Sequence, residues 1–248
     1  MRRISAWVVI FAVFPAQADD HYPFVSDVPG MQEARLSPDY WVSRLANTET
    51  RMTPGQVREF NARAFSSDAN MHDLSQLPDA LSDEQLLALI NKVSRRASSP
   101  RYHAVDGTLV SDKDYRRWSA MANLNAIQAQ NPVRWGLAVR RASMRSYPVT
   151  DRVLKSPKDK HLDRFQETAV FPGERLAILH TSADGEWFFV LNYHYGAWLP
   201  RNAVGLGSRA DIDTWSTAEP RLVVTGDRVH TNFNPLDPRS SEVALEMG

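Results

Sequence analysis

The chain has 248 residues, and its 29 lysine and arginine residues balance 29 aspartate and glutamate residues, so the formal net charge is zero. This balance excludes the global attraction to nucleic acid that a strongly basic protein shows. The absence of cysteine excludes disulfides, cysteine-ligated zinc and a cysteine nucleophile. We therefore expect ordinary packing to stabilise the fold, with no metal or other cofactor.

The first 18 residues have the pattern of a secretory signal peptide. Arg2 and Arg3 precede an apolar run, Ile4–Phe14, and Ala16 and Ala18 supply the small residues of a cleavage site. The run is too short to span a bilayer, which takes about 20 residues. We expect a periplasmic or secreted protein that begins at Asp19 and has no membrane association after cleavage.

Residues 19–130 are predicted to form a helical N-terminal region. Prolines predict an extended arm over residues 21–38. Thr53 followed by Pro54 predicts a helix from Pro54 to about Phe65. Further helices are expected after Ser82 and after Ser111, each of which precedes acidic residues and an apolar stripe of helical spacing.

From Trp135 onward the apolar residues alternate in short runs between turn signals, which is typical of strands. We therefore place the main domain boundary near residue 131 and expect a small β-barrel over residues 131–207. The fold class is α+β. The predicted strands are Gly136–Val139, Gln166–Val170, Glu174–His180, Trp187–Leu191 and Ala197–Leu199.

Beyond the barrel we expect a flexible polar linker. The glycine pair Gly205 and Gly207 lacks the third glycine of a phosphate loop, so a linker is favoured there and over residues 208–220. Asp211 and Asp213 are interpreted as solvated linker charges. Residues 221–248 begin a new segment that is too short to form a core alone.

The chain carries no hydrolase signature, such as Gly-x-Ser-x-Gly or His-Glu-x-x-His. The notable feature is a basic stretch, Arg134–Arg164, in which nine lysines and arginines exceed three aspartates by six. Part of it is a long loop, residues 148–162, that we interpret as a binding loop. An excess of this kind can face an anionic partner.

The segment Gly196–Val204, with the sequence GAWLPRNAV, resembles the last-strand signature of SH3 barrels. The neighbouring segments Arg134–Pro148, Asp163–Thr168 and Phe171–Glu174 resemble the first bacterial SH3 (SH3b) domain of NlpC/P60 peptidoglycan endopeptidases. Residues 38–61 are similar to the N-terminal stabilising region of that family, and Leu222–Asn232 is similar to the opening of its second SH3b domain. The family's cysteine-containing catalytic domain would lie beyond Gly248, which suggests a truncated chain.

The resemblance implies a non-catalytic module that recognises a peptidoglycan stem peptide, since the first SH3b domain of the family helps to select stem peptides with a free N-terminal L-Ala. Arginine can hold the carboxylates of such a ligand. The candidate binding residues are Arg145 and Tyr147, then Tyr193 and Tyr195, and finally Trp198. For Arg145 a structural role is the alternative, and for Trp198 and the other aromatic residues between 187 and 198 the alternative is packing in the core.

Two other functions remain open from the sequence. The chain can be the accessory half of an active γ-D-glutamyl-diamino-acid endopeptidase whose Cys-His domain lies beyond residue 248. It can also be an SH3-type module that binds proline-rich proteins, which would require an exposed aromatic groove.

Overall fold

The computed structural model describes residues 24–47, 49–220, 222–224, 226 and 228–246. The predicted signal peptide, with its cleavage residues Ala16 and Ala18, lies outside the described residues. The chain divides into two compact units, Met1–Glu49 and Thr50–Gly248, and each is described by itself. In the part of the chain that the structure describes, no helix is both long and apolar enough to cross a bilayer.

The first unit contains a 3₁₀ turn, Glu33–Leu36, and a short helix, α1 (Pro38–Val42). The Ser37 hydroxyl caps α1 by accepting a hydrogen bond from the Asp39 amide at 3.3 Å. The prediction of an extended arm is therefore wrong for residues 33–38. Pro38 occupies the first turn of a helix, where its missing amide hydrogen costs nothing, and so it starts an element where we expected it to break one.

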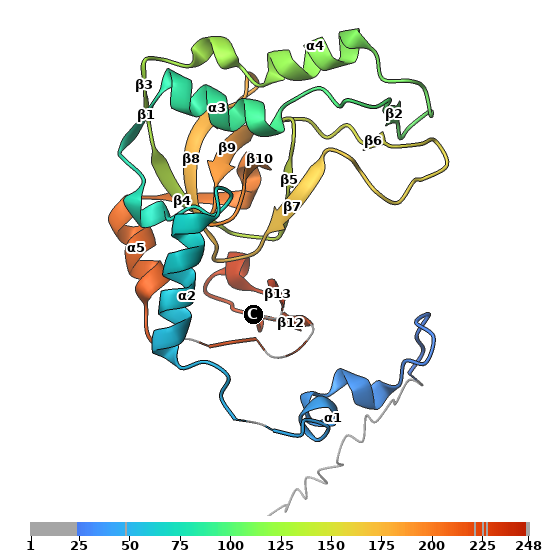
Figure 1. Cartoon of the computed structure of the whole chain (residues 1–248), viewed down its shortest axis with the longest axis vertical. Helices are drawn as coiled ribbons and strands as arrows, with labels where there is room; N and C mark the ends of the chain where they lie inside the picture. The colour runs from blue at the N-terminus through green and yellow to red at the C-terminus, as the bar shows by residue number, and fades with distance from the viewer. Residues whose placement is uncertain (1–23, 48, 221, 225, 227, 247–248) are drawn as a thin grey trace, which may run out of the picture. The chain divides into compact units, whose positions relative to one another are not determined.

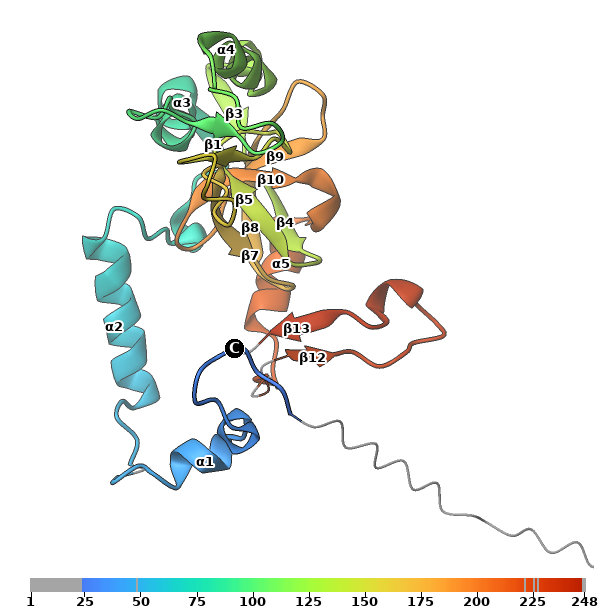
Figure 2. The ribbon, with the colours of Figure 1, turned by 90° about the vertical axis from the view of Figure 1, so that its right-hand side faces the viewer.

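The three helices predicted for residues 54–122 are confirmed. They are α2 (Pro54–Ser67), α3 (Asp83–Val93) and α4 (Asp112–Met121). Each begins with a capping box, in which the side chains of the N-cap residue and the third helical residue bond to each other's backbone amides. Figure 2 shows α2 set apart from the seven-stranded sheet, and none of its residues is buried.

The second unit is built around a seven-stranded antiparallel sheet with the order β11-β4-β8-β9-β10-β5-β7 (Figure 1). Its strands are β4 (Arg134–Ala138), β5 (Ala142–Arg145), β7 (Gln166–Val170), β8 (Arg175–Thr181), β9 (Trp187–Leu191), β10 (Gly196–Pro200) and β11 (Val204–Gly207). All five predicted strands are present. The additional β5 has the sequence ASMR, which lacks the β-branched and aromatic residues that mark a strand.

Among the described residues, three two-stranded sheets accompany this sheet. They are β1 (Ala80–Ser82) with β3 (Gln130–Pro132), β2 (Tyr102–His103) with β6 (Val153–Leu154), and β12 (Arg228–His230) with β13 (Ala244–Glu246). The predicted binding loop, residues 148–162, thus contains the strand β6. The similarity of residues 221–248 to a second SH3b domain stays a prediction.

Helix α3 and the barrel share one hydrophobic core. Leu86, Ile90 and Val93 of α3 belong to the same buried cluster as Phe189 and Trp198 of the sheet. The pairing of β1 with β3 also crosses the predicted boundary at residue 131. Residues on the two sides of that boundary therefore form one packed body, because the barrel leaves an apolar face that α3 covers (Figure 1).

The predicted linker after the barrel is wrong. Residues 204–207 form the edge strand β11, and residues 209–217 form a helix, α5 (Arg209–Thr217), capped by the Ser208 hydroxyl, which accepts from the Asp211 amide at 3.1 Å. Asp213 forms an ion pair with Arg175 of β8 and is not a freely solvated charge. The glycines allow close strand approach: a Cβ atom on Gly136 would lie 2.7 Å from the Gly205 carbonyl oxygen.

Candidate functional site

Arg145 is buried, with 8% of its surface exposed. Its Nη1 donates to Asp163 Oδ2 at 2.8 Å, and its Nη2 donates to the Asp151 carbonyl. The Asp163 side chain is also buried. The guanidinium therefore joins the end of β5 to the basic loop, which favours the structural alternative over contact with a ligand.

Tyr147 and Trp198, two more of the predicted binding residues, are 1% and 0% exposed. Tyr147 lies among Trp118 and Phe165, at ring-centre distances of 6.0 and 5.0 Å, and burial raises its pKa to about 12. Trp198 Nε1 donates to the Ser94 hydroxyl at 3.0 Å. Both side chains are therefore buried in the core. For Trp198, packing in the core was the alternative to ligand binding.

Tyr193 and Tyr195 lie in the turn between β9 and β10 and reach the surface. Tyr193 is 51% exposed, and Tyr195 is half-buried. The turn is shaped by Asn192, whose side-chain oxygen accepts from the amides of His194 at 3.1 Å and Tyr195 at 2.7 Å. Asn192 itself is fully buried, so a buried side chain fixes the conformation of the turn.

A hollow of about 350 Å³ lies next to Tyr195, and we call it the arginine groove. Four of its residues are arginines that come from two distant parts of the chain: three follow α3, and the fourth precedes β7. It is lined by Val93, Arg95, Arg96, Ala97, Ser98, Arg101, Tyr115, Ser146, Arg164, Phe165 and Glu167.

The arginines of the groove are only partly neutralised. Arg96 pairs with Asp112 at 2.6 Å, with both side chains largely exposed, and Arg164 reaches Asp159 only at 4.0 Å. Arg95 forms no ion pair with any residue that the structure describes. Exposed pairs of this kind contribute about 0–1 kcal/mol, so an anionic ligand can replace the partners at little cost.

The one acidic residue that lines the groove is Glu167, and it is held by two hydroxyls. Tyr195 Oη donates to Glu167 Oε2 at 2.6 Å, and Ser146 Oγ donates to Glu167 Oε1. Burial, together with the hydrogen bond to Glu167 and its charge, raises the pKa of Tyr195 to about 12. Tyr195 therefore remains a neutral hydroxyl, and the groove presents a fixed carboxylate among arginines.

No ligand-binding role was predicted for Arg95, Arg96 and Arg101, which supply three of the four arginines of the groove. Arg95 and Arg96 fit the last turn of a helix, where cations are common, but α3 ends at Val93 and leaves both residues outside it. The predicted basic stretch does not form one surface. Arg134 donates to Thr181, Arg141 pairs with Glu246, and of the lysines and arginines of that stretch only Arg164 lines the groove.

Among the residues that the structure describes, no group of three or more histidine, aspartate or glutamate side chains is placed to hold a metal ion. The charged groups that line the arginine groove are four arginines and one carboxylate. This arrangement suits a ligand that carries both carboxylates and an amino group.

Residues 152–200 match the family model of an SH3 domain of the SH3b1 type, which spans β6 to β10. The chain is thus an α+β protein with an SH3b1-type domain. The chain has no sequence match among curated proteins.

The fold resembles a solved structure of an NlpC/P60 endopeptidase from Photobacterium damselae subsp. piscicida. The TM-score is 0.57 at 16% sequence identity, over 79% of this chain and 46% of that one. The likeness thus extends over less than half of the endopeptidase. The resemblance to NlpC/P60 proteins predicted from the sequence is confirmed in the SH3b domain and in the fold.

Proposed function

We propose that this chain is an exported, non-catalytic module that recognises peptidoglycan stem peptides, as the accessory portion of an NlpC/P60-type cell-wall hydrolase. The arginine groove is the observation that carries the proposal. Its four arginines line one hollow beside an SH3b1-type domain, a domain type associated with cell-wall binding. Stem peptides are rich in carboxylates, which arginine holds with two parallel hydrogen bonds.

Glu167 gives the proposed site its selectivity. A fixed carboxylate next to Tyr195 attracts an amino group, so a stem peptide with a free N-terminal L-Ala fits better than one whose amine is acylated. Two hydrogen bonds hold the carboxylate of the exposed Glu167 in place, and a peptide with an acylated amine would leave it without a charged partner.

Thiol-based hydrolysis lies outside this proposal, because residues 1–248 contain no cysteine. Peptidase activity of the NlpC/P60 kind would need a catalytic domain in addition to these residues.

The test is a pulldown of the purified chain from Asp19 onward with insoluble peptidoglycan, while released peptides are assayed in parallel. The Arg95→Ala/Arg164→Ala variant removes two groove cations, and Arg58→Ala/Arg63→Ala removes two exposed cations of α2 as the charge-matched control. We expect the groove variant to bind at least about tenfold more weakly, since a charged hydrogen bond is worth about 1.5–3 kcal/mol. The control should bind like the parent chain.

Glu167→Gln completes the design with soluble stem peptides. It should weaken the binding of a free-amine peptide and leave the N-acetylated form unchanged. Absence of binding by the parent chain, or equal losses in the groove and control variants, would overturn the proposal. Release of peptides by the parent chain would show that the module is itself catalytic.

A further inference from the structure

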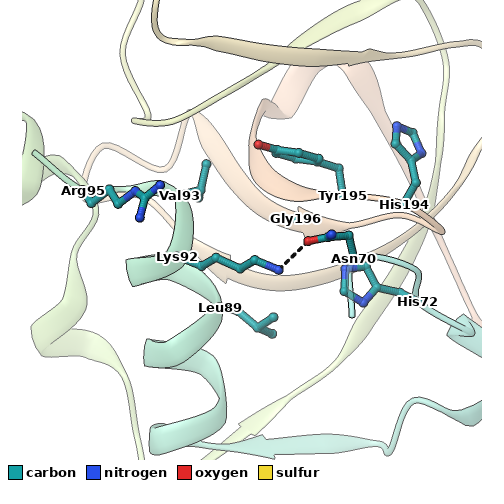
Figure 3. A pocket seen from close by; sticks show the side chains of 9 residues that line it. All are labelled: Asn70, His72, Leu89, Lys92, Val93, Arg95, His194, Tyr195 and Gly196. Atoms are coloured by element: carbon teal, nitrogen blue, oxygen red, sulfur yellow. Dashed lines mark hydrogen bonds between the residues drawn. The ribbon is translucent and has the colours of Figure 1, made fainter. Parts of the chain in front are cut away.

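A second hollow shares two lining residues, Val93 and Arg95, with the arginine groove. We call it the histidine cavity; its volume is about 260 Å³ (Figure 3). Three segments form it: the chain after α2, the last two turns of α3, and the β9–β10 turn. It is lined by Asn70, His72, Leu89, Lys92, Val93, Arg95, His194, Tyr195 and Gly196.

Hydrogen bonds hold the walls of this cavity in place. The His72 amide donates to the Tyr193 carbonyl at 2.7 Å and so joins the chain after α2 to the β9–β10 turn. The Asn192 side chain shapes that turn and donates in addition to Glu174 Oε2 at 3.1 Å. Side chains that line the cavity are therefore presented by ordered backbone, which lowers the entropy lost when a ligand binds.

The cavity is lined by basic groups and by no carboxylate. Lys92, Arg95, His72 and His194 contribute nitrogen atoms, and Lys92 Nζ donates to a neutral acceptor, Asn70 Oδ1, at 2.9 Å (Figure 3). Nδ1 of His194 is shielded from solvent and has no hydrogen-bond partner among the described residues. A lining that contains several basic groups and no carboxylate favours an anionic ligand.

The remainder of the lining defines the ligand further. Leu89 and Val93 give an apolar surface beside the ammonium group of Lys92. The small volume suits the end of a short chain, in which a carboxylate adjoins an apolar group. We propose that the histidine cavity binds the carboxylate of an acylated amino acid or a peptide C-terminus, with Lys92 and His72 as its partners. This inference does not depend on the ligand of the arginine groove.

The site should bind more tightly in mild acid. Burial, then the charges of Lys92 and His194, lower the pKa of His72 from its usual value, and Asp68 opposes them. A bound carboxylate adds a negative charge and favours protonated His72. Binding and proton uptake are therefore linked, and affinity rises as the pH falls through the pKa of His72.

Nuclear magnetic resonance of the mature chain tests the inference, with N-acetylalanine as the probe and N-acetylalanine amide as its uncharged control. We expect the acid to shift the signals of His72, Lys92 and Gly196. Its dissociation constant should be several-fold lower at about pH 5.5 than at about pH 7.5, where histidine changes charge. The amide should cause no such shifts.

Substitutions test whether the acid binds in the histidine cavity. Lys92→Met should weaken binding of the acid by about tenfold, which corresponds to about 1.4 kcal/mol, whereas Lys113→Met on the exposed face of α4 should leave it unchanged. His72→Gln should bind with the high-pH affinity at both pH values. The inference fails if the amide shifts the same signals, if no signals at the cavity move, or if Lys92→Met binds like the parent chain. A peptidoglycan pulldown of the Lys92→Met variant tests the proposed function separately, so a failure of this inference can be distinguished from a failure of the proposed function.

Discussion

Arg145 illustrates how a single residue organises the loop that surrounds it. Its partner Asp163 also accepts hydrogen bonds through Oδ1 from the amides of Val153, at 3.2 Å, and Phe165, at 3.0 Å. The pair thus fixes the loop of residues 148–162 against the end of β5. Both side chains are buried, so neither charge can be lost alone without leaving the other unpaired.

We therefore predict that Arg145→Met lowers the free energy of unfolding by about 3–5 kcal/mol, the cost of leaving one partner of a buried pair. Arg140→Met, at an exposed position of the same basic stretch, should change it by less than about 1 kcal/mol. Urea unfolding followed by tryptophan fluorescence measures both. Equal effects of the two substitutions would show that the Arg145–Asp163 pair contributes nothing to stability.

At the scale of elements, the pairing of β4 with β11 decides where α5 begins. Gly136 faces Leu206 in this pair, and Gly205 lies opposite Leu137. The two backbones approach so closely that a side chain at Gly136 would meet both the Gly205 carbonyl and the Val204 side chain. Because Ser208 caps α5 directly after β11, the position of the helix depends on this close approach.

Gly136→Ala is accordingly expected to destabilise the protein by about 1–3 kcal/mol, as overpacking does. Gly55→Ala in the first turn of α2 is the matched control, because its added methyl group would meet only ordinary contacts at 3.8 and 3.9 Å. It should be neutral or stabilising by about 0.4–1 kcal/mol. Thermal unfolding distinguishes the two variants. A Gly136→Ala variant as stable as the parent would mean that β4 and β11 can move apart without loss of stability.

At the scale of the whole molecule, the barrel does not complete its own core. Leu86 and Ile90 of α3 are fully buried against sheet residues, and the indole of Trp198 bonds to Ser94, just beyond the helix. A barrel without α3 would expose this face to water. Exposed apolar surface costs about 25 cal/mol per Å², so the helical region stabilises the barrel directly.

A fragment of residues 131–207 should therefore unfold without a cooperative transition, whereas residues 50–220 should unfold cooperatively. Calorimetry and the dispersion of amide signals measure this difference. A sharp transition in the shorter fragment would show that the SH3b1-type domain is independent of α3.

Local signals in the sequence determined much of this protein. The residue pairs of the capping boxes at α2, α3 and α4 lie three positions apart, and the apolar run Trp187–Leu191 lies within one strand, so each signal acts over a few residues. The same holds for the segment GAWLPRNAV, on which the SH3 resemblance depended. The glycine pair at residues 205–207 misled us because its role is a contact with another strand.

Only the tertiary structure decided which side chains reach solvent. Arg145 and Arg164 belong to the same basic stretch, yet the first is buried by the loop that folds over it and the second lines the arginine groove. The groove joins residues 93–101 to residues 146–167, and the histidine cavity joins residue 72 to residue 194. Exposure and juxtaposition depend on packing between segments that are distant in the chain, and a local pattern carries no information on that packing.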